Sequence, residues 1–235
     1  MITKETLERI SNCTNITNSI TIKYPVTMAV SDSRDMVMRI DLSDMEEFDR
    51  PVSFFNRLSN FLCITKLYDD FKINVHDNII TIQDANSKSS TDFIESYAEL
   101  MTDYNFDEEQ FTKTENAVSI QEFELTANEV KKLKTAGGTL QNIEKLIIEN
   151  QGEELKIKLK SSNIAARVDD CFTIVKDIPS TKQFNISIPF SNFTKLSNQN
   201  YKFFVKYNSK NNSYRVLIHN LDNDKIKLLL SVNFY

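Results

Sequence analysis

Short segments in which apolar and polar residues alternate recur along this chain of 235 residues, and they restrict its possible folds more than any other feature. The clearest are I-E-K-L-I-I-E (143–149) and L-K-I-K-L (155–159), which a turn near Gln151-Gly152 would join as a hairpin. Alternation with a period of two is typical of a strand with one buried face. Sheets built from such strands are commonly antiparallel. We therefore expect antiparallel sheets that are covered on one side.

The expected elements follow a similar order in the two halves of the chain, with helices interrupting runs of strands. In the first half we predict helices over 3–13 and 54–65, and strands over 20–23, 26–30, 36–40, 47–52, 71–75, 79–83 and 91–95. In the second half we predict helices over 126–134 and 190–196, and strands over 119–125, 143–149, 155–159, 171–175, 184–188, 201–207, 214–219 and 225–232. This recurrence of order predicts a duplicated architecture.

The acidic stretch from Asp92 to Phe111 holds seven acids and no base, and most of it is interpreted as a connection between two domains. The chain is long enough for two domains of about 110 to 120 residues. The prediction is an α+β protein with an N-terminal domain over 1–108, a connector over 109–117 and a C-terminal domain over 118–235.

A lysine-rich helix is expected where the sequence reads T-A-N-E-V-K-K-L-K (126–134). Thr126 and Glu129 have the spacing of a capping box, which marks the start of a helix. Val130 and Leu133 give this helix an inward face, which leaves its lysines on the exposed arc. The whole chain has a formal net charge of −5, so the cluster is not a consequence of average composition.

The charge of the four expected helical segments contrasts with that of the remainder. The segments 53–66, 190–198 and 126–136 carry +2, +1 and +2, and the first helix is balanced, so the four total +5 and the remainder carries −10. A single lysine-rich helix is often only a solvated face. Several positive helices in an acidic chain favour contact with a polyanion, and the lack of interleaved aromatics favours duplex backbone over stacked single strands.

No catalytic motif is recognised in the sequence. Its two histidines, His76 and His219, have no partner motif, and the adjacent acids Asp69-Asp70 and Asp169-Asp170 are typical of solvated turns. The pair Gly137-Gly138 suits a helix terminus rather than a phosphate loop. We therefore expect a protein that is not an enzyme and holds no cofactor or metal.

The remaining composition points to an ordinary intracellular protein. No run of 18 apolar residues is present, and the N-terminus lacks the apolar core of a signal peptide, so neither a membrane span nor secretion is expected. The three isolated cysteines, Cys13, Cys63 and Cys171, are expected to be reduced and buried.

Several segments resemble the DNA polymerase sliding clamps, or processivity factors, and most closely the trimeric clamps of T-even-type tailed phages. The resemblance spans nearly the whole chain and rests on the order of elements together with five segments. These are M-I-T-K-E-T-L-E-R-I (1–10), F-D-R-P-V-S-F-F-N-R-L-S-N-F-L-C-I (48–64), F-K-I-N-V-H-D-N-I-I-T-I-Q-D-A (71–85), F-E-L-T-A-N-E-V-K-K-L (123–133) and F-N-I-S-I-P-F-S-N-F-T-K-L-S-N-Q-N-Y-K-F-F-V (184–205).

The resemblance implies two clamp domains per chain and three chains joined head to tail into a six-domain ring, with sheets outside and helices lining the hole. It implies a homotrimer that encircles double-stranded DNA without regard to sequence, binds the replicative DNA polymerase and an ATP-dependent clamp loader, and in some relatives serves late-transcription factors. It also implies a location in the cytoplasm of an infected host cell. The family's DNA-facing basic residues correspond here to Lys4, Arg9, Arg57, Lys131, Lys132, Lys134 and Lys195.

An alternative is a β-rich oligomeric viral structural or adaptor protein that does not encircle DNA. It would share the strands and the oligomer, but it has no reason to collect lysines on helices. Reversing the charge of Lys131, Lys132 and Lys134 separates the two hypotheses, because only a clamp should lose processivity with its oligomer intact.

Overall fold

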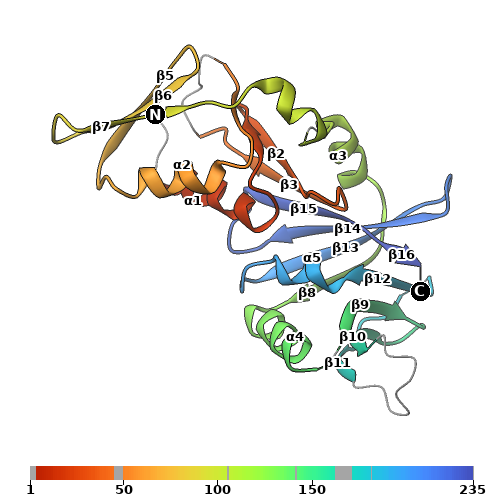
Figure 1. Ribbon diagram of the computed structural model, residues 1–235. Helices are drawn as coiled ribbons and strands as arrows, with labels where there is room; N and C mark the ends of the chain where they lie inside the picture. Colours follow the sequence, from red (N-terminus) through yellow and green to blue (C-terminus); the bar gives the residue numbers. More distant parts are fainter. Residues whose placement is uncertain are drawn as a thin grey trace. The chain divides into compact units, whose positions relative to one another are not determined.

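The computed structural model describes residues 4–44, 50–104, 106–140, 142–161, 171–180 and 182–234 of the chain (Figure 1). It divides into two compact units, Met1–Glu108 and Glu109–Tyr235, called unit 1 and unit 2 below. No helix in these ranges is long and apolar enough to cross a membrane.

Unit 1 contains two packed helices and antiparallel strands. Its elements are α1 (Lys4–Ser11), the 3-10 helix η1 (Asn12–Asn15), β1 (Ile20–Ile22), β2 (Val26–Val30), β3 (Met36–Asp41), β4 (Val52–Phe54), α2 (Leu58–Thr65), β5 (Phe71–His76), β6 (Ile79–Asp84), β7 (Ser90–Ile94) and the 3-10 helix η2 (Ala98–Tyr104). Strand β1 pairs with β4, β2 with β3, and β5, β6 and β7 form a three-stranded sheet.

Three phenylalanines join helix and strands in the core of unit 1. Phe54 of β4, Phe61 of α2 and Phe93 of β7 have ring centroids 4.7 to 5.9 Å apart. All three side chains are buried, and aromatic pairs at this separation stabilise a core beyond the area that they bury. This cluster fixes α2 on the strands, and α1 lies beside α2 in Figure 1.

The prediction that a helix covers 54–65 is wrong in its first turn. Phe54 belongs to β4, and Asn56 has a positive φ of 54°, so the chain turns before α2 begins at Leu58. The side chain of Asn18 caps the new helix, because its Oδ1 accepts from the backbone N–H of Ser59 at 2.7 Å. Of the strand predicted over 47–52, residues 47–49 lie outside the described residues, and of 50–52 only Val52 belongs to a strand, β4.

Unit 2 begins with a helix that was not predicted, α3 (Glu108–Glu115), which starts at the last residue of unit 1. Most of the residues assigned to a connector, 109–117, therefore form a helix, which is anchored by the fully buried Phe111. The rest of unit 2 comprises β8 (Ser119–Leu125), α4 (Ala127–Thr139), β9 (Ile143–Asn150), β10 (Leu155–Ser161), β11 (Cys171–Lys176), β12 (Phe184–Pro189), α5 (Phe190–Thr194), β13 (Tyr201–Asn208), β14 (Ser213–Asn220), β15 (Ile226–Ser231) and β16 (Asn233–Phe234).

The strands of unit 2 form two antiparallel arrays, in the orders β11-β10-β9-β12-β16 and β15-β14-β13-β8. In the first array Ile157 of β10 lies opposite Ile148 of β9, and both side chains are buried. In the second array Phe123 of β8 stacks on Phe203 of β13 at 4.9 Å. In β8 and β10 buried residues alternate with more exposed ones, as predicted for strands with one face in the core, whereas residues 146–150 of β9 are all buried.

Candidate nucleic-acid interface

Helix α4 presents the strongest positive face among the helices of unit 2. Its start is the predicted capping box: the N–H of Glu129 donates to Thr126 Oγ1 at 3.2 Å, and the N–H of Thr126 donates to Glu129 Oε2 at 2.8 Å. Val130 and Leu133 are fully buried. Because the inward face is fixed in this way, Lys131 and Lys132 are exposed, as the helical spacing predicts.

Glu129, the only acid of α4, does not cancel these lysines. Its Oε1 pairs with Lys176 Nζ of β11 at 2.8 Å. Burial raises the pKa of Glu129, but the hydrogen bond and charge of Lys176 and the bonds to Thr126 outweigh it, so the net shift is downward. The carboxylate is therefore held ionised by the fold, and its charge is matched by a lysine outside the helix.

Lys134 links α4 to the end of α5 rather than facing solvent. Its Nζ donates to the carbonyl of Leu196, and the side chain is half-buried, which lowers its pKa. Helices α4 and α5 also touch at Gly137, where an added Cβ would lie only 2.0 Å from Cζ of Phe190. Lys195 follows α5 as its C-terminal cap and is half-exposed.

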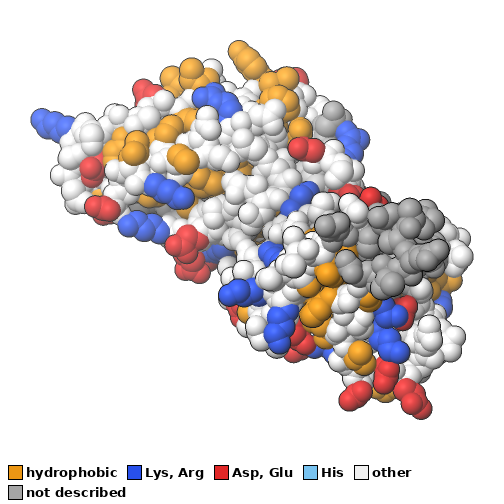
Figure 2. Space-filling model, turned by 60° about the horizontal axis from the view of Figure 1, so that its bottom comes forward, with side chains coloured by type: hydrophobic (Ala, Val, Ile, Leu, Met, Phe, Trp, Pro, Cys, Tyr) orange, Lys and Arg blue, Asp and Glu red, His pale blue; other side chains and the backbone are white. Residues whose placement is uncertain are grey.

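A shallow groove runs beside the lysines of α4. It has a volume of about 470 Å³ and is bounded by α4 and the start of β11, with Lys131 and Lys132 on one side and Phe172 on the other. In Figure 2, Lys and Arg side chains flank a small hydrophobic patch on the part of the molecule that carries α4. The exposed surface of α4 is thus positive, with an apolar margin.

Helix α1 of unit 1 has a mixed surface. Lys4 is exposed, but so are Glu5 and Glu8 of the same helix. Arg9, which was predicted to face DNA, is only 2% exposed. Its guanidinium donates to both carboxylate oxygens of Asp44, at 2.9 and 2.6 Å, and to the carbonyl of Asp41 at 2.9 Å.

The pairing of Arg9 explains why its charge is not on the surface. The hydrogen bond to Asp44 raises the pKa of Arg9 against the opposing effect of burial, so the side chain stays charged in the interior. It therefore joins α1 to the segment after β3, and this geometry favours a structural role over DNA contact.

Arg57 is also occupied by its own unit. Its guanidinium lies 4.3 Å above the ring of Phe93 and donates to the carbonyl of Ile94 at 3.0 Å. It therefore holds the start of α2 against β7 and is half-buried.

The sequence-based selection missed Lys66. This exposed lysine caps the C-terminus of α2, and it lines, together with Lys4, Glu8 and Asp69, a hollow of about 450 Å³ beside α1 and α2. Two sequence features could have identified Lys66. It ends a segment without acids, and a cation at the C-terminus of a helix complements the helix dipole.

The remaining candidates for chemistry have ordinary surroundings. His76 is exposed beside Asp77, and His219 is half-buried, with its pKa lowered first by burial and then by Lys227. Asp69 and Asp70 are exposed, whereas 169–170 lie outside the described residues. Within the described ranges, no group of three or more His, Cys, Asp or Glu could hold a metal ion.

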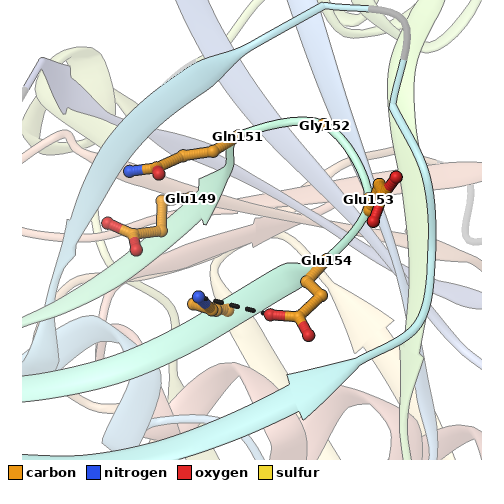
Figure 3. Close-up of a pocket in the computed structure, with 6 residues that line it drawn as sticks. Glu149, Gln151, Gly152, Glu153 and Glu154 are labelled. Atoms are coloured by element: carbon orange, nitrogen blue, oxygen red, sulfur yellow. Dashed lines mark ion pairs between the residues drawn. The ribbon is translucent and has the colours of Figure 1, made fainter.

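The acid-lined hollow at the β9–β10 turn is shown in Figure 3. Glu154 there is paired with Lys156 at 3.2 Å, and Glu149 with Lys158. These pairings suit a solvated turn and do not form a reactive arrangement.

The expectation that all three cysteines are buried holds only for Cys13, whose thiol pKa is raised by burial. Cys63 of α2 and Cys171 of β11 are exposed. All three are free thiols.

Comparison with known proteins identifies the fold through structure alone. No protein-family model matches the chain, and no curated protein matches its sequence. Among solved structures, the β clamp of Helicobacter pylori in complex with 5-chloroisatin is similar with a TM-score of 0.66 and 11% identity, over 97% of this chain and 64% of that one. The DnaN sliding clamp of Pseudomonas aeruginosa is similar with a TM-score of 0.68 and 10% identity, over 100% of this chain and 64% of that one.

The proliferating cellular nuclear antigen of Entamoeba histolytica is similar with a TM-score of 0.67 and 12% identity, over 97% of this chain and 96% of that one. The chain thus spans about two thirds of the bacterial clamps but nearly the whole of the Entamoeba protein. At 10 to 12% identity the likeness concerns the fold. The predicted clamp fold is confirmed: this chain has the fold of the DNA sliding clamps.

Proposed function

We propose that this protein is a sliding clamp that encircles duplex DNA and tethers a replicative DNA polymerase for processive synthesis. The observation that carries the proposal is structural similarity to sliding clamps over 97 to 100% of the chain, at TM-scores of 0.66 to 0.68. The positive surface of α4 in an otherwise acidic protein supports it.

The basic residues that we propose to face DNA differ from those predicted from the sequence. We assign this role to the cations with solvent exposure on the helix pairs, which are Lys4, Lys66, Lys131, Lys132 and Lys195. Arg9, Arg57 and Lys134 instead hold the helices in place through contacts inside their own unit.

So few cations give weak binding. Each neutralised phosphate contributes to an affinity that falls steeply with salt and does not read sequence. Enclosure of the duplex by a closed ring would supply the retention that this affinity lacks. Tethering then raises the effective concentration of the polymerase at the primer end, so that dissociation becomes rare.

A ring needs several copies of the chain. We propose three, because the chain contains two compact units and the resemblance to the phage clamps implies a ring of six domains. Heterologous contacts that repeat by a three-fold rotation close such a ring. An ATP-dependent loader would open it, and the T-even-type phage origin and cytoplasmic location in an infected cell belong to the same proposal.

Other partners would dock through peptides. The H. pylori β clamp has been solved bound to a DNA ligase peptide. We propose that polymerase and loader bind this chain in a comparable manner, and that late-transcription factors are further candidates.

The molar mass in solution tests this proposal. One chain has a mass of 27.2 kDa, so light scattering after size-exclusion chromatography should give about 82 kDa for a closed trimer. The mass should stay constant over a range of loading concentrations. A mass of one chain even at high concentration would leave no ring to enclose DNA, and a monomeric adaptor protein would replace the clamp as the favoured function.

A further inference from the structure

A second basic surface lies in unit 2, where the β13–β14 hairpin ends close to α3. A hollow of about 510 Å³ is lined there by α3, the turn that follows it and the hairpin. Four of its lining residues are cationic, namely Lys113, Lys206, Lys210 and Arg215, and none of the described residues that line it is Asp or Glu. In a chain with a net charge of −5, this is a local excess of positive charge.

The pleat of the hairpin directs two of these cations to one face. Lys206 of β13 and Arg215 of β14 lie opposite each other, so their side chains share a face of the sheet. The preceding Val205 and the following Val216 are fully buried on the other face. The cations therefore lie on the face opposite to the one that carries these valines.

Lys206 is held by neutral partners. Its Nζ donates to the carbonyls of Glu115 and Ala117 at 2.9 and 2.6 Å, and the residue is 7% exposed. An ammonium group has three donors, so these two bonds leave one N–H for another acceptor. Burial lowers the pKa of Lys206, against the opposing charges of Glu122 and Glu115.

The other three cations are available to an incoming anion. Arg215 Nη1 donates to the Thr114 hydroxyl at 3.1 Å, which is a neutral partner. Lys113 pairs with Glu109 at 2.7 Å, but both side chains are 71% exposed, and such surface pairs contribute little. Lys210 is exposed in the hairpin turn, where its backbone N–H donates to Asn208 Oδ1 at 3.0 Å.

The size of the hollow decides which polyanion fits. A volume of about 510 Å³ is within the range of sites for small ligands and short peptide segments. A duplex backbone instead needs an extended positive surface. The proposed DNA contacts of unit 2 come from α4 and α5, and α3 lies well apart from α4 in Figure 1. Polar side chains of the hairpin turn, such as Asn208 and Asn211, could also bond a peptide backbone.

We propose that this hollow binds an acidic segment of a partner protein, through carboxylates that contact Lys210, Arg215 and Lys113. This deepens the proposed function by giving the chemistry of one partner segment, and it rests on that function only for the identity of the partner. Binding itself requires neither DNA nor a closed ring.

The test uses the full chain and a fluorescein-labelled peptide of six glutamates with blocked ends. Fluorescence anisotropy at low salt should show saturable binding that weakens as salt is added. The variant Lys210→Glu should raise the Kd about fivefold, the scale expected for reversing one exposed charge contact. Lys88→Glu is the matched control, because Lys88 is an exposed lysine in the turn between β6 and β7 of unit 1.

Three results would overturn the inference. The peptide could fail to bind at low salt, or both variants could weaken binding equally, which would indicate attraction without a site. A short DNA duplex could also displace the peptide and itself lose affinity with Lys210→Glu, which would assign the hollow to DNA. None of these results bears on the mass of the oligomer, so the clamp proposal is tested separately.

Discussion

Arg9 and Lys131 both lie on helices and carry the same charge, but their surroundings give them opposite roles. The 2% exposure of Arg9 and its paired bonds to Asp44 make it a structural cation. We expect Arg9→Gln to lower the free energy of unfolding by about 1–3 kcal/mol, because Asp44 and the Asp41 carbonyl lose a charged donor and Asp44 is partly solvated. Urea unfolding measures this change, with Lys4→Gln on the same helix as the near-neutral control. If Arg9→Gln left stability unchanged but weakened DNA binding, Arg9 would be a DNA contact after all.

Lys131 and Lys132 are exposed on α4, so their replacement should affect DNA and not the fold. We expect the double variant Lys131→Glu, Lys132→Glu to abolish most of the processivity gained with loader and polymerase, because repulsion replaces two phosphate contacts. The oligomer mass should not change. The milder pair of alanine variants should reduce the slope of log affinity against log salt by about two. Lys72→Glu, an exposed lysine of β5, serves as the control; full processivity in the double variant would mean that α4 does not face the duplex.

At the scale of elements, α4 and α5 can approach only because residue 137 is glycine. A Cβ there would overlap the ring of Phe190, which is 8% exposed and has little room to move. We expect Gly137→Ala to destabilise unit 2 by about 1–3 kcal/mol through overpacking. Gly138→Ala is the matched control, since nothing lies within 4 Å of its added Cβ, and it should be neutral or stabilising by up to about 1 kcal/mol. Equal effects in thermal unfolding would show that the two helices separate easily.

The start of α4 should make stability depend on pH. The folded pKa of Glu129 lies below its usual value, so its contribution is present above the unfolded pKa and is lost as pH falls through the folded pKa. We expect Glu129→Gln to cost about 1 kcal/mol at neutral pH, the scale of a lost cap and partly exposed ion pair, and less in acid once the wild-type carboxylate is protonated. Urea unfolding of the wild-type protein and of Glu129→Gln, each at neutral and at acidic pH, measures the difference in their free energies of unfolding. An equal cost at both would assign the effect to packing instead of charge.

The strands were predictable because their signal is local. Alternation over a few residues identifies β5, β6, β8, β13 and β14 within a residue or two at each end. The capping box locates the start of α4, but the helix continues to Thr139, five residues beyond its predicted end. The start of α2 depends on Asn18, which caps it from 41 residues away, so the 3-4 spacing of Phe54 and Phe55 with later residues was misleading.

The candidate DNA interface was likewise predictable only where the sequence signal is local. The exposure of Lys131 and Lys132 follows from the pattern of their own helix. The burial of Arg9 depends on Asp44, 35 residues distant, and no local pattern reveals that partner. Likewise, Lys206 and Lys210 come together with Lys113 in a hollow only because α3 lies near the end of the β13–β14 hairpin.

At the scale of the whole molecule, the proposed function requires retention without strong contacts. A protein with a net charge of −5 and a few exposed helix lysines should leave linear DNA readily, above all when salt screens those charges. If the ring is closed, topology instead of affinity holds it on DNA without free ends. We expect protein loaded on nicked circular DNA to stay bound when salt is raised from about 50 to 200 mM, a change that strips proteins held by phosphate contacts alone.

Cutting the loaded circle once supplies the decisive comparison. The protein should then slide off the linear product at unchanged salt, and blocking both ends with a bulky tag should restore retention. Gel filtration of the DNA with labelled protein measures the bound fraction in each case. Release from the intact circle at the higher salt, or identical retention on cut and uncut DNA, would mean that contacts and not enclosure hold the protein. Loss of the protein only from DNA with free ends would show that enclosure retains it. The weak positive surface is then sufficient, because it needs only to orient the duplex and not to bind it tightly.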